Sequence, residues 1–395
     1  MKRLFLAALL GAPLAHAAEP LPSFRTDPAG ITVSGLSSGA YMAGQMHVAF
    51  SDRIAGAGLV AGGPYGCATG SVAFALQRCT ETTLGEPDPA ALVARAKGLA
   101  TAGRIAPLEN LADDPVYVFG GTEDRTVLPA VVRTAAEFYA LAGVPEARIL
   151  FKDDLAAGHA FLTEDRGAPC AATRPPYVND CDYDQAGAIL GHLLGPLNGP
   201  AAPTGRTIAF DQAEFLPDPT RHGMALEGFA YVPPACEAGG CKVHVAFHGC
   251  RQTAGMVGDA FTATTGYDRW AETNRLIVLF PQTHDPAGDP LSRNPRACWD
   301  WWGYDDPAHA TRTGRQMRAV AGMLDRLEGR TEPPAESCAR IEAGNLAHWQ
   351  AGRARACEIW SLCAVGSGEN IGFGLGQTVL YEHPAGNFTT SACAG

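Results

Sequence analysis

Short apolar runs alternate with amphipathic stretches along the first half of the chain. The apolar runs predict strands, at residues 30–34, 54–60, 116–119 and 149–151. The stretches with apolar residues at helical spacing predict helices, at residues 40–50, 128–142 and 182–194. Strands that alternate with helices predict an α/β fold, in which a largely parallel sheet carries helices on both faces.

The pattern changes after residues 195–205, a stretch dense in Gly and Pro that predicts a linker or a long surface loop. Beyond it we expect an antiparallel hairpin of two strands, two buried strands and a closing helix, at residues 208–215, 226–232, 243–247, 276–280 and 317–327. Pro333 and Pro334 then mark a second boundary. Residues 335–395 carry four cysteines and a Gly-rich run, which together predict a small β-rich module.

The first residues, 1–17, predict a secretory signal peptide. Lys2 and Arg3 precede a short apolar run, and Ala15-His16-Ala17 supplies the small residues of a cleavage site. The apolar run is too short to span a bilayer. We therefore expect a secreted, extracellular protein whose main domain comprises residues 18–330.

Charge and cysteine content narrow the class of protein. A net charge of −11 argues against nucleic acid and anionic membranes as partners, because binding to either needs clustered Lys and Arg. We also expect the protein to be a monomer. The twelve cysteines, an even number without C-x-x-C spacing, favour disulfides over a metal site, and no cofactor is expected. The expected pairs of neighbouring cysteines are Cys67–Cys79, Cys170–Cys181, Cys236–Cys241 and Cys357–Cys363, with Cys338–Cys393 as the second pair of the module.

Residues 35–39, Gly-Leu-Ser-Ser-Gly, match the pattern G-x-S-x-G. Between a predicted strand and a predicted helix, this pattern is typical of the nucleophile elbow of α/β-hydrolases. The sharp turn needs small neighbours and exposes the serine hydroxyl at a helix N-terminus, where the helix dipole helps to stabilise an oxyanion. Ser37 is therefore the candidate nucleophile, and the alternative is a Gly-rich turn with an incidental serine.

A nucleophilic serine needs a histidine base, and the base needs a carboxylate that orients it. In α/β-hydrolases these groups follow the serine in the order acid, histidine, each on a loop after a strand. Asp124 and His159 have these positions, because they follow the predicted strands 116–119 and 149–151. The rival acids are Glu123 and, less favoured, Asp153 and Asp154, and the rival base is His248, which better suits a structural role.

The oxyanion hole presents a problem of chain order. One N–H comes from the residue after the nucleophile, here Ser38, and the second comes from a loop that normally precedes the serine and often reads H-G-G. Nothing before Ser37 resembles this loop, but residues 245–250 fit it well, far downstream. A circular permutation explains the order, with residues 195–205 joining the ancestral ends at an exposed, breaker-rich site.

Four segments carry specific motifs, at residues 35–43 (GLSSGAYMA), 61–65 (AGGPY), 248–252 (HGCRQ) and 298–302 (CWDWW). Together they resemble the extracellular poly(3-hydroxybutyrate) depolymerases of the circularly permuted type, over about residues 24–325. The resemblance implies a single-domain hydrolase with Ser37, Asp124 and His159 as its triad. It also implies an oxyanion hole formed by the Ser38 and Cys250 N–H groups, and a polymer-binding crevice lined by aromatic residues. The tail after Thr331 departs from the single-domain pattern.

The candidates for substrate binding in that crevice are Trp299, Trp301 and Trp302. In an extended segment Trp299 and Trp301 would share one face, and Trp302 would lie on the other. Exposed aromatic rings would make flat apolar contacts with a polyester chain, whereas ordinary core packing is the alternative. We also expect a disulfide between Cys250 and Cys298, which would tie the oxyanion loop to this Trp-rich loop.

The expected activity is hydrolysis of ester bonds in poly(3-hydroxybutyrate) or a related polyhydroxyalkanoate, through an acyl-enzyme on Ser37. Two alternatives stay open. The first is an esterase that acts on feruloyl or acetyl esters of plant polysaccharide, and the second is a catalytically inactive secreted binding protein. The intact serine, aspartate and histidine in the expected order argue against the second alternative.

Overall fold

The computed structural model describes residues 18–68, 70–284, 293–330, 339–358, 361–365, 368–383 and 387–390. The expected signal peptide, residues 1–17, lies outside these residues. Within the described part, no helix is both long enough and apolar enough to cross a membrane.

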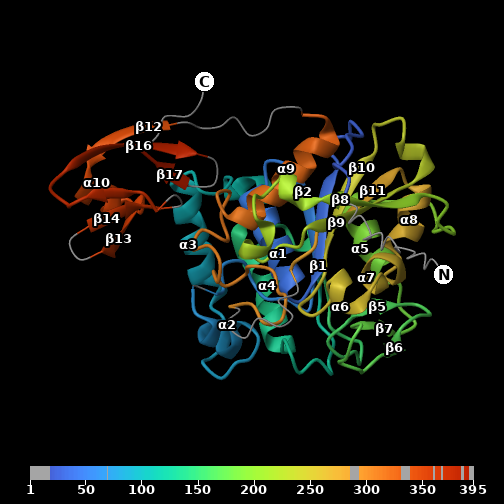
Figure 1. Cartoon of the computed structure of the whole chain (residues 1–395). Coiled ribbons are helices and arrows are strands. Elements are labelled where there is room, and N and C mark those ends of the chain that lie inside the picture. Colours follow the sequence, from blue (N-terminus) through green and yellow to red (C-terminus); the bar gives the residue numbers. More distant parts are fainter. Residues whose placement is uncertain are drawn as a thin grey trace, which may run out of the picture.

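An eight-stranded sheet forms the centre of the molecule, with the strand order β4-β3-β2-β1-β10-β11-β9-β8 (Figure 1). The strands are β1 (Ile31–Leu36), β2 (Ile54–Val60), β3 (Val116–Phe119), β4 (Ile149–Lys152), β8 (Arg206–Asp211), β9 (Glu227–Val232), β10 (Lys242–Phe247) and β11 (Leu276–Phe280). From β4 to β11 all neighbours pair in parallel, whereas β9 pairs antiparallel with β11 and with β8. The largely parallel α/β fold and the antiparallel hairpin are confirmed.

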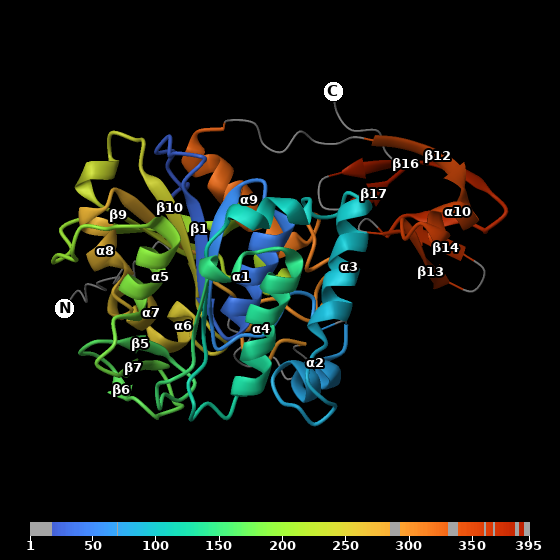
Figure 2. The same ribbon diagram turned by 180° about the vertical axis from the view of Figure 1, so that it is seen from behind.

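Helices cover both faces of this sheet and bury its central strands on both sides. One face packs a large apolar cluster under α1 (Ser38–Ala49), α3 (Pro89–Thr101), α4 (Pro129–Ala142) and α9 (Arg315–Glu328). The other face packs a second cluster under α5 (Gln185–Leu194), α7 (Ala260–Thr264) and α8 (Tyr267–Thr273). The views from the front and from behind both show the two helical layers (Figures 1 and 2).

Two predicted boundaries differ from the structure by more than two residues, for local reasons. The predicted strand 208–215 ends early, since β8 stops at Asp211 and residues Gln212–Glu214 form a 3-10 turn. The Asp211 side chain accepts a hydrogen bond from the Ala213 backbone at 2.8 Å and thereby caps that turn. The helix predicted from residue 182 begins at Gln185, because the Asp184 side chain accepts from the Gly187 backbone at 2.8 Å and caps its N-terminus.

A small sheet lies beyond the carboxyl end of β4 and has the strand order β5-β7-β6. Its strands are β5 (Phe161–Thr163), β6 (Ala168–Pro169) and β7 (Val178–Asp180). The Cys170–Cys181 disulfide closes this segment. The sheet therefore holds the residues that directly follow His159.

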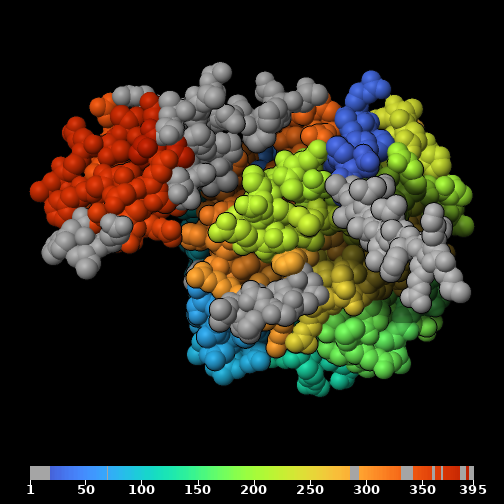
Figure 3. All heavy atoms as spheres, in the orientation of Figure 1, coloured from blue at the N-terminus to red at the C-terminus, as the bar shows by residue number. Residues whose placement is uncertain are grey.

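The C-terminal residues form two further three-stranded sheets, β12-β16-β17 and β13-β14-β15. Their elements are β12 (Ala339–Gly344), α10 (Asn345–Gln350), β13 (Ala354–Glu358), β14 (Ser361–Ala364), β15 (Asn370–Gly372), β16 (Gln377–His383) and β17 (Asn387–Thr389). A small apolar cluster around Ala364, Ile371 and Leu380 is made only of residues from this region. Figures 1 and 2 place these strands to one side of the main sheet, near α3, and Figure 3 shows them as a protrusion.

The disulfides follow the expected pattern wherever the structure describes both partners. The pairs Cys67–Cys79, Cys170–Cys181, Cys236–Cys241, Cys250–Cys298 and Cys357–Cys363 are formed. The expected pair Cys338–Cys393 lies outside the described residues.

Candidate active site

Ser37 occupies a strained turn between β1 and α1. Its φ of 57° and ψ of −120° are unfavourable for a residue with a side chain, as expected at a nucleophile elbow. The two glycines of the motif allow this turn to pack against β10. A Cβ on Gly39 would lie 2.2 Å from the Phe247 carbonyl oxygen, and one on Gly35 would lie 2.3 Å from the Gly39 backbone. The sequence pattern thus follows from close backbone contacts.

Asp124 and His159 form a buried pair. Asp124 follows β3, and its Oδ2 lies 2.7 Å from Nδ1 of His159, which comes after β4. The other oxygen, Oδ1, accepts hydrogen bonds from the backbone of Thr126 at 2.7 Å and of Val127 at 3.0 Å. These donors fix the carboxylate, which favours the tautomer in which His159 donates from Nδ1. Nε2 then has no hydrogen-bond partner among the described residues.

The rival acid, Glu123, does not reach the histidine. Its side chain is 49% exposed and pairs with Arg125 at 3.4 Å. Asp154, another rival, pairs with Lys152 at 2.7 Å, and this hydrogen bond lowers the pKa of the Asp154 carboxyl. Of these acids, the structure brings Asp124 to His159.

The rival base, His248, is completely buried at the end of β10. Its Nε2 accepts a hydrogen bond from the Thr283 backbone at 3.1 Å, and its Nδ1 donates to the Gly249 carbonyl at 2.7 Å. Burial lowers the pKa of His248 to about 4, so the ring is neutral at neutral pH. With both nitrogens engaged, His248 has a structural role.

Ser37, Asp124 and His159 lie at the carboxyl edge of the sheet, because each follows the end of a parallel strand, β1, β3 and β4 respectively. Among the described residues no hydrogen bond joins the Ser37 hydroxyl to His159. Such bonds are often long without substrate and tighten only in the Michaelis complex. The shared edge and the Asp124–His159 pair are therefore the geometric basis for the site.

Two backbone segments position His159. Gly158 donates its N–H to the Cys170 carbonyl at 2.9 Å, and His159 donates its N–H to the Thr173 hydroxyl at 3.0 Å. Gly121, before Asp124, allows the two loops to touch, because a Cβ there would lie 2.2 Å from the Ala157 carbonyl oxygen. Gly121 thus allows the close approach of the loops that carry the acid and the base.

The candidate oxyanion donors belong to two segments that are in contact. Ser38 is the first residue of α1, and Cys250 lies in the loop that follows β10. A Cβ on Gly39 would come within 2.5 Å of the His248 carbonyl oxygen, so the elbow and the loop that carries Cys250 are in direct contact. Within the described part of the chain, neither the Ser38 nor the Cys250 N–H has a hydrogen-bond acceptor. Both groups remain available for an anionic oxygen.

Trp299 and a disulfide brace the candidate oxyanion loop, which carries Cys250. The Cys250–Cys298 disulfide joins it to the Trp-rich loop, and the Trp299 indole donates from Nε1 to the His248 carbonyl at 3.0 Å. The Trp299 backbone N–H lies 3.4 Å from the Ser38 hydroxyl. The elbow, the oxyanion loop and the Trp-rich loop therefore form one connected unit.

The exposure expected of the three tryptophans is not found. Trp299 is fully buried, and Trp301 and Trp302 are only 6% and 8% exposed. Trp301 stacks on Tyr41 with ring centroids 4.2 Å apart, and Trp302 packs on Tyr304 at 4.9 Å. The expectation assumed an extended segment, whereas the chain turns here, with the Trp301 N–H donating to the Trp299 carbonyl at 3.0 Å. This low exposure favours core packing over substrate contact, most clearly for the fully buried Trp299.

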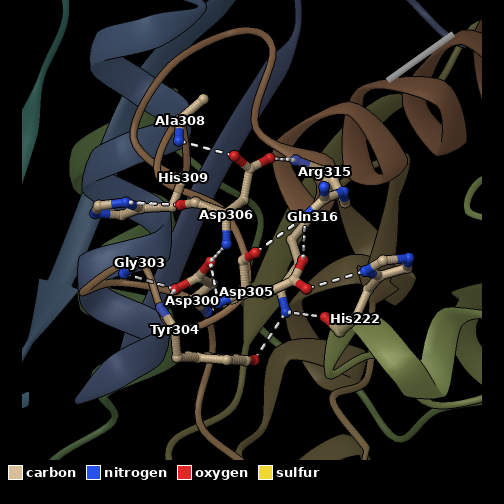
Figure 4. A network of polar contacts seen from close by, with 10 residues as sticks. All are labelled: His222, Asp300, Gly303, Tyr304, Asp305, Asp306, Ala308, His309, Arg315 and Gln316. Atoms are coloured by element: carbon tan, nitrogen blue, oxygen red, sulfur yellow. Dashed lines mark hydrogen bonds and ion pairs between the residues drawn. The ribbon is translucent and has the colours of Figure 1, made fainter. Parts of the chain in front are cut away.

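Asp300 organises this turn, a role that the sequence motif did not reveal (Figure 4). Its Oδ1 accepts from the backbones of Gly303 and Tyr304 at 2.8 and 2.9 Å, and its Oδ2 accepts from that of Asp306 at 2.9 Å. Its own N–H donates to the Gln316 side chain at 2.9 Å. Burial raises the pKa of Asp300 to about 7, against the effect of these donors. The network makes the Trp-rich loop a fixed support.

Removing the Cys250–Cys298 disulfide is expected to impair catalysis. Replacing both cysteines by serine should lower kcat on a soluble ester by about 10- to 100-fold, because a displaced oxyanion donor weakens transition-state stabilisation. The pair closes a loop with a sequence separation of 48, so unfolding should also become easier by about 4 kcal/mol. The measurements are kcat per active site and Tm.

The matched control is the Cys236–Cys241 pair, whose sequence separation is 5. Its double serine variant should lose about 2 kcal/mol of stability and keep its kcat. Equal losses of kcat in the two double variants would show that the Cys250–Cys298 disulfide has no special link to the site.

The arrangement of these groups is suited to nucleophilic catalysis. A serine at a helix N-terminus, an oriented histidine and two free N–H groups can form and hydrolyse an acyl-enzyme. In the described ranges, no group of three His, Cys, Asp or Glu side chains could hold a metal ion.

No family model matches the chain, but individual relatives do. It is 45% identical over 337 residues to the poly(3-hydroxybutyrate) depolymerase of Delftia acidovorans, a match that covers 83% of this chain and 66% of that protein. It is 35% identical over 327 residues to the polyhydroxybutyrate depolymerase of Talaromyces funiculosus, a match that covers 79% of this chain and 93% of that protein. The chain thus spans just under two thirds of the Delftia protein and nearly all of the fungal one.

Two solved structures are similar in fold to this chain. The first is a serine-to-alanine variant of PHB depolymerase complexed with an R3HB trimer, with a TM-score of 0.70 and 33% identity. The second is the PHB depolymerase from Penicillium funiculosum, with a TM-score of 0.69 and 33% identity. Each match covers 79% of this chain and 100% of the other. On these similarities, the chain belongs to the poly(3-hydroxybutyrate) depolymerase family.

Proposed function

We propose that this protein is a carboxylic ester hydrolase that cleaves the ester bonds of poly(3-hydroxybutyrate) or a related polyhydroxyalkanoate through an acyl-enzyme on Ser37. The observation that carries the proposal is the 2.7 Å pair of Asp124 and His159 on the sheet edge where the strained Ser37 also lies. The relatives named above supply the substrate class. The R3HB trimer in one of the similar structures is a short form of the same polyester.

The mechanism follows from the geometry. Ser37 Oγ attacks the ester carbonyl carbon while His159 Nε2 takes its proton, and the tetrahedral oxyanion accepts hydrogen bonds from the Ser38 and Cys250 N–H groups. His159 then returns the proton to the leaving alkoxide, which departs as the alcohol end of the chain. A water then attacks the acyl-enzyme and gives its proton to His159. The bond between the acyl group and Ser37 Oγ breaks, His159 returns the proton to Ser37 Oγ, and the carboxylic acid is released. Asp124 stabilises the imidazolium in both steps.

The test is an assay of the mature protein on polyhydroxybutyrate film. We expect release of soluble 3-hydroxybutyrate oligomers from the film, together with hydrolysis of soluble short-chain esters. Cleavage of feruloyl or acetyl esters of polysaccharide, with the film left intact, would favour the plant-polysaccharide esterase instead. A protein inactive on all of these esters would be a binding protein.

We also propose that the protein is secreted after removal of residues 1–17. The disulfides and the low content of charged residues, 18%, support an extracellular setting. A polymer too large to enter a cell requires an enzyme outside it.

We further propose that the catalytic domain is circularly permuted. β10, which precedes the candidate oxyanion loop, pairs directly with β1 although it follows β1 by about 200 residues in the sequence. Residues 195–205, without helix or strand, connect α5 to β8 and offer a place for the joined ends. The oxyanion strand thus lies beside the nucleophile strand in space despite its late position in the chain.

The residues after the second boundary, 335–395, are proposed to form a separate small module. Support comes from their own apolar cluster and from the Cys357–Cys363 disulfide, since so small a core depends on covalent links. Leu346, Trp349, Phe373 and Leu375 are 47–89% exposed on it. The candidate triad and the oxyanion donors all lie before this region.

Truncation after Arg330 should therefore give a folded enzyme. We expect activity on soluble esters to stay within about twofold of the full chain, because no active-site group is removed. Circular dichroism, Tm and kcat check this result. An aggregated or wholly inactive product would mean that the tail is integral to the fold, whereas a normal kcat with poor adsorption to film would identify a polymer-binding module.

A further inference from the structure

The Gln252 side chain takes no part in the mechanism above, although it ends the HGCRQ segment. It is only 1% exposed. Its Oε1 accepts the Gly249 N–H at 2.8 Å, and its Nε2 donates to the carbonyls of Pro176 at 2.8 Å and Tyr177 at 3.1 Å. One buried amide thus joins the oxyanion loop to a segment about 75 residues away in sequence.

That second segment is tied to the candidate base. The Tyr177 carbonyl also accepts the N–H of Phe161, two residues after His159, at 2.9 Å. The His159 N–H donates to Thr173, in the same segment, at 3.0 Å. Through these contacts Gln252 connects the loop that carries Cys250 to the backbone on which His159 sits.

The oxyanion loop needs support on this side because its backbone is strained. Arg251 has a φ of 59°, in the left-handed region that residues with side chains seldom adopt. The Cys250–Cys298 disulfide holds one side of the loop to the Trp-rich loop. Gln252 holds the other side, toward His159, and gives the buried Gly249 N–H its acceptor.

We propose that Gln252 is a positioning residue, which bridges Gly249 to Pro176 and Tyr177 and so sets the distance between the Cys250 N–H and His159. This inference rests on the proposed function, because it takes Cys250 as an oxyanion donor. The oxyanion exists only in the tetrahedral state, so loss of the bridge should lower kcat and leave KM nearly unchanged.

The test is Gln252→Met, which keeps the length and volume of the side chain and removes its hydrogen bonds. On p-nitrophenyl butyrate we expect kcat to fall by about 10- to 100-fold, with KM within about threefold. Affinity for a trifluoromethyl ketone, whose adduct with serine carries an oxyanion, should fall by a similar factor. A residue that only stabilises the fold would not weaken this affinity selectively.

Gln212→Met is the matched control. Gln212 is equally buried, accepts from the Gln282 N–H at 3.0 Å and donates to the carbonyls of Ala225 and Gln282 at 2.8 and 2.9 Å. It makes the same number and kinds of bonds without joining the oxyanion loop to the histidine segment. Its variant should lose stability and keep both kcat and ketone affinity.

The inference is wrong if Gln252→Met keeps kcat and ketone affinity within about threefold of Gln212→Met. If Gln252→Met does not fold, Gln252→Glu, which retains an acceptor for Gly249, takes its place with the same expected losses. If neither variant folds, Gln252 serves the fold and the inference is likewise wrong. An active Ser37→Ala variant would reject the proposed function itself, whatever Gln252 does.

Discussion

Replacing Ser37 by alanine is expected to lower kcat on soluble esters by about three orders of magnitude or more. The substitution removes the oxygen that forms the acyl-enzyme, and no other described side chain occupies the strained turn between β1 and α1. KM and Tm should change little, because a methyl group fits where the hydroxyl was. The measurement is steady-state kinetics on p-nitrophenyl butyrate, with Tm as a check of folding.

The neighbouring Ser38 provides the control. Ser38→Ala keeps the backbone N–H that is assigned to the oxyanion hole and loses only a hydroxyl that lies 3.4 Å from the Trp299 N–H. Its kcat should stay within about tenfold of the original enzyme, since one long hydrogen bond contributes little. Activity of Ser37→Ala at the original level would exclude Ser37 as the nucleophile.

Asp124→Asn is expected to lower kcat by about 10³- to 10⁴-fold. The amide cannot supply the negative charge that stabilises the imidazolium, and it favours the wrong tautomer of His159. The loop should keep its conformation, because the amide oxygen of asparagine can still accept from the backbones of Thr126 and Val127, as Asp124 does now. The loss should therefore appear in kcat and not in Tm.

Glu123→Gln is the matched comparison, because it makes the same chemical change one residue earlier. Among the residues that the structure describes, its exposed carboxylate pairs with Arg125 alone. Surface ion pairs contribute little, so kcat should change by less than about threefold. A severe loss in Glu123→Gln with a mild one in Asp124→Asn would move the acid to Glu123.

The sequence predicts best where a strand is buried on both faces. The strands β2, β3 and β11 have the bounds expected from their apolar runs, because breakers flank each run closely. Helices α2 (Val72–Cys79) and α3 are absent from the predicted elements. Each is largely exposed and has only two buried residues, so few apolar positions mark a face toward the core. One start signal was readable for α3, since Asp88 before Pro89 caps the helix.

The candidate site was likewise predictable only in part. The acid and the base could be assigned from loop position, because chain order restricts which loops meet at one sheet edge. The burial of the tryptophans could not be assigned, since it depends on a turn that Asp300 organises through the backbones of Gly303, Tyr304 and Asp306. The bridging role of Gln252 was hidden for a different reason, because its partners lie about 75 residues away. Contacts between distant loops carry no local signal.

The central claim is that Ser37 is the nucleophile of an active hydrolase, and covalent labelling tests it most directly. The mature protein would be treated with a fluorophosphonate and digested, and the modified peptide would be sequenced by mass spectrometry. The account predicts one phosphonate per chain, located on Ser37, with parallel loss of activity on both soluble ester and polyhydroxybutyrate film. A label on another residue, or full labelling of Ser37 with the film activity intact, would contradict it.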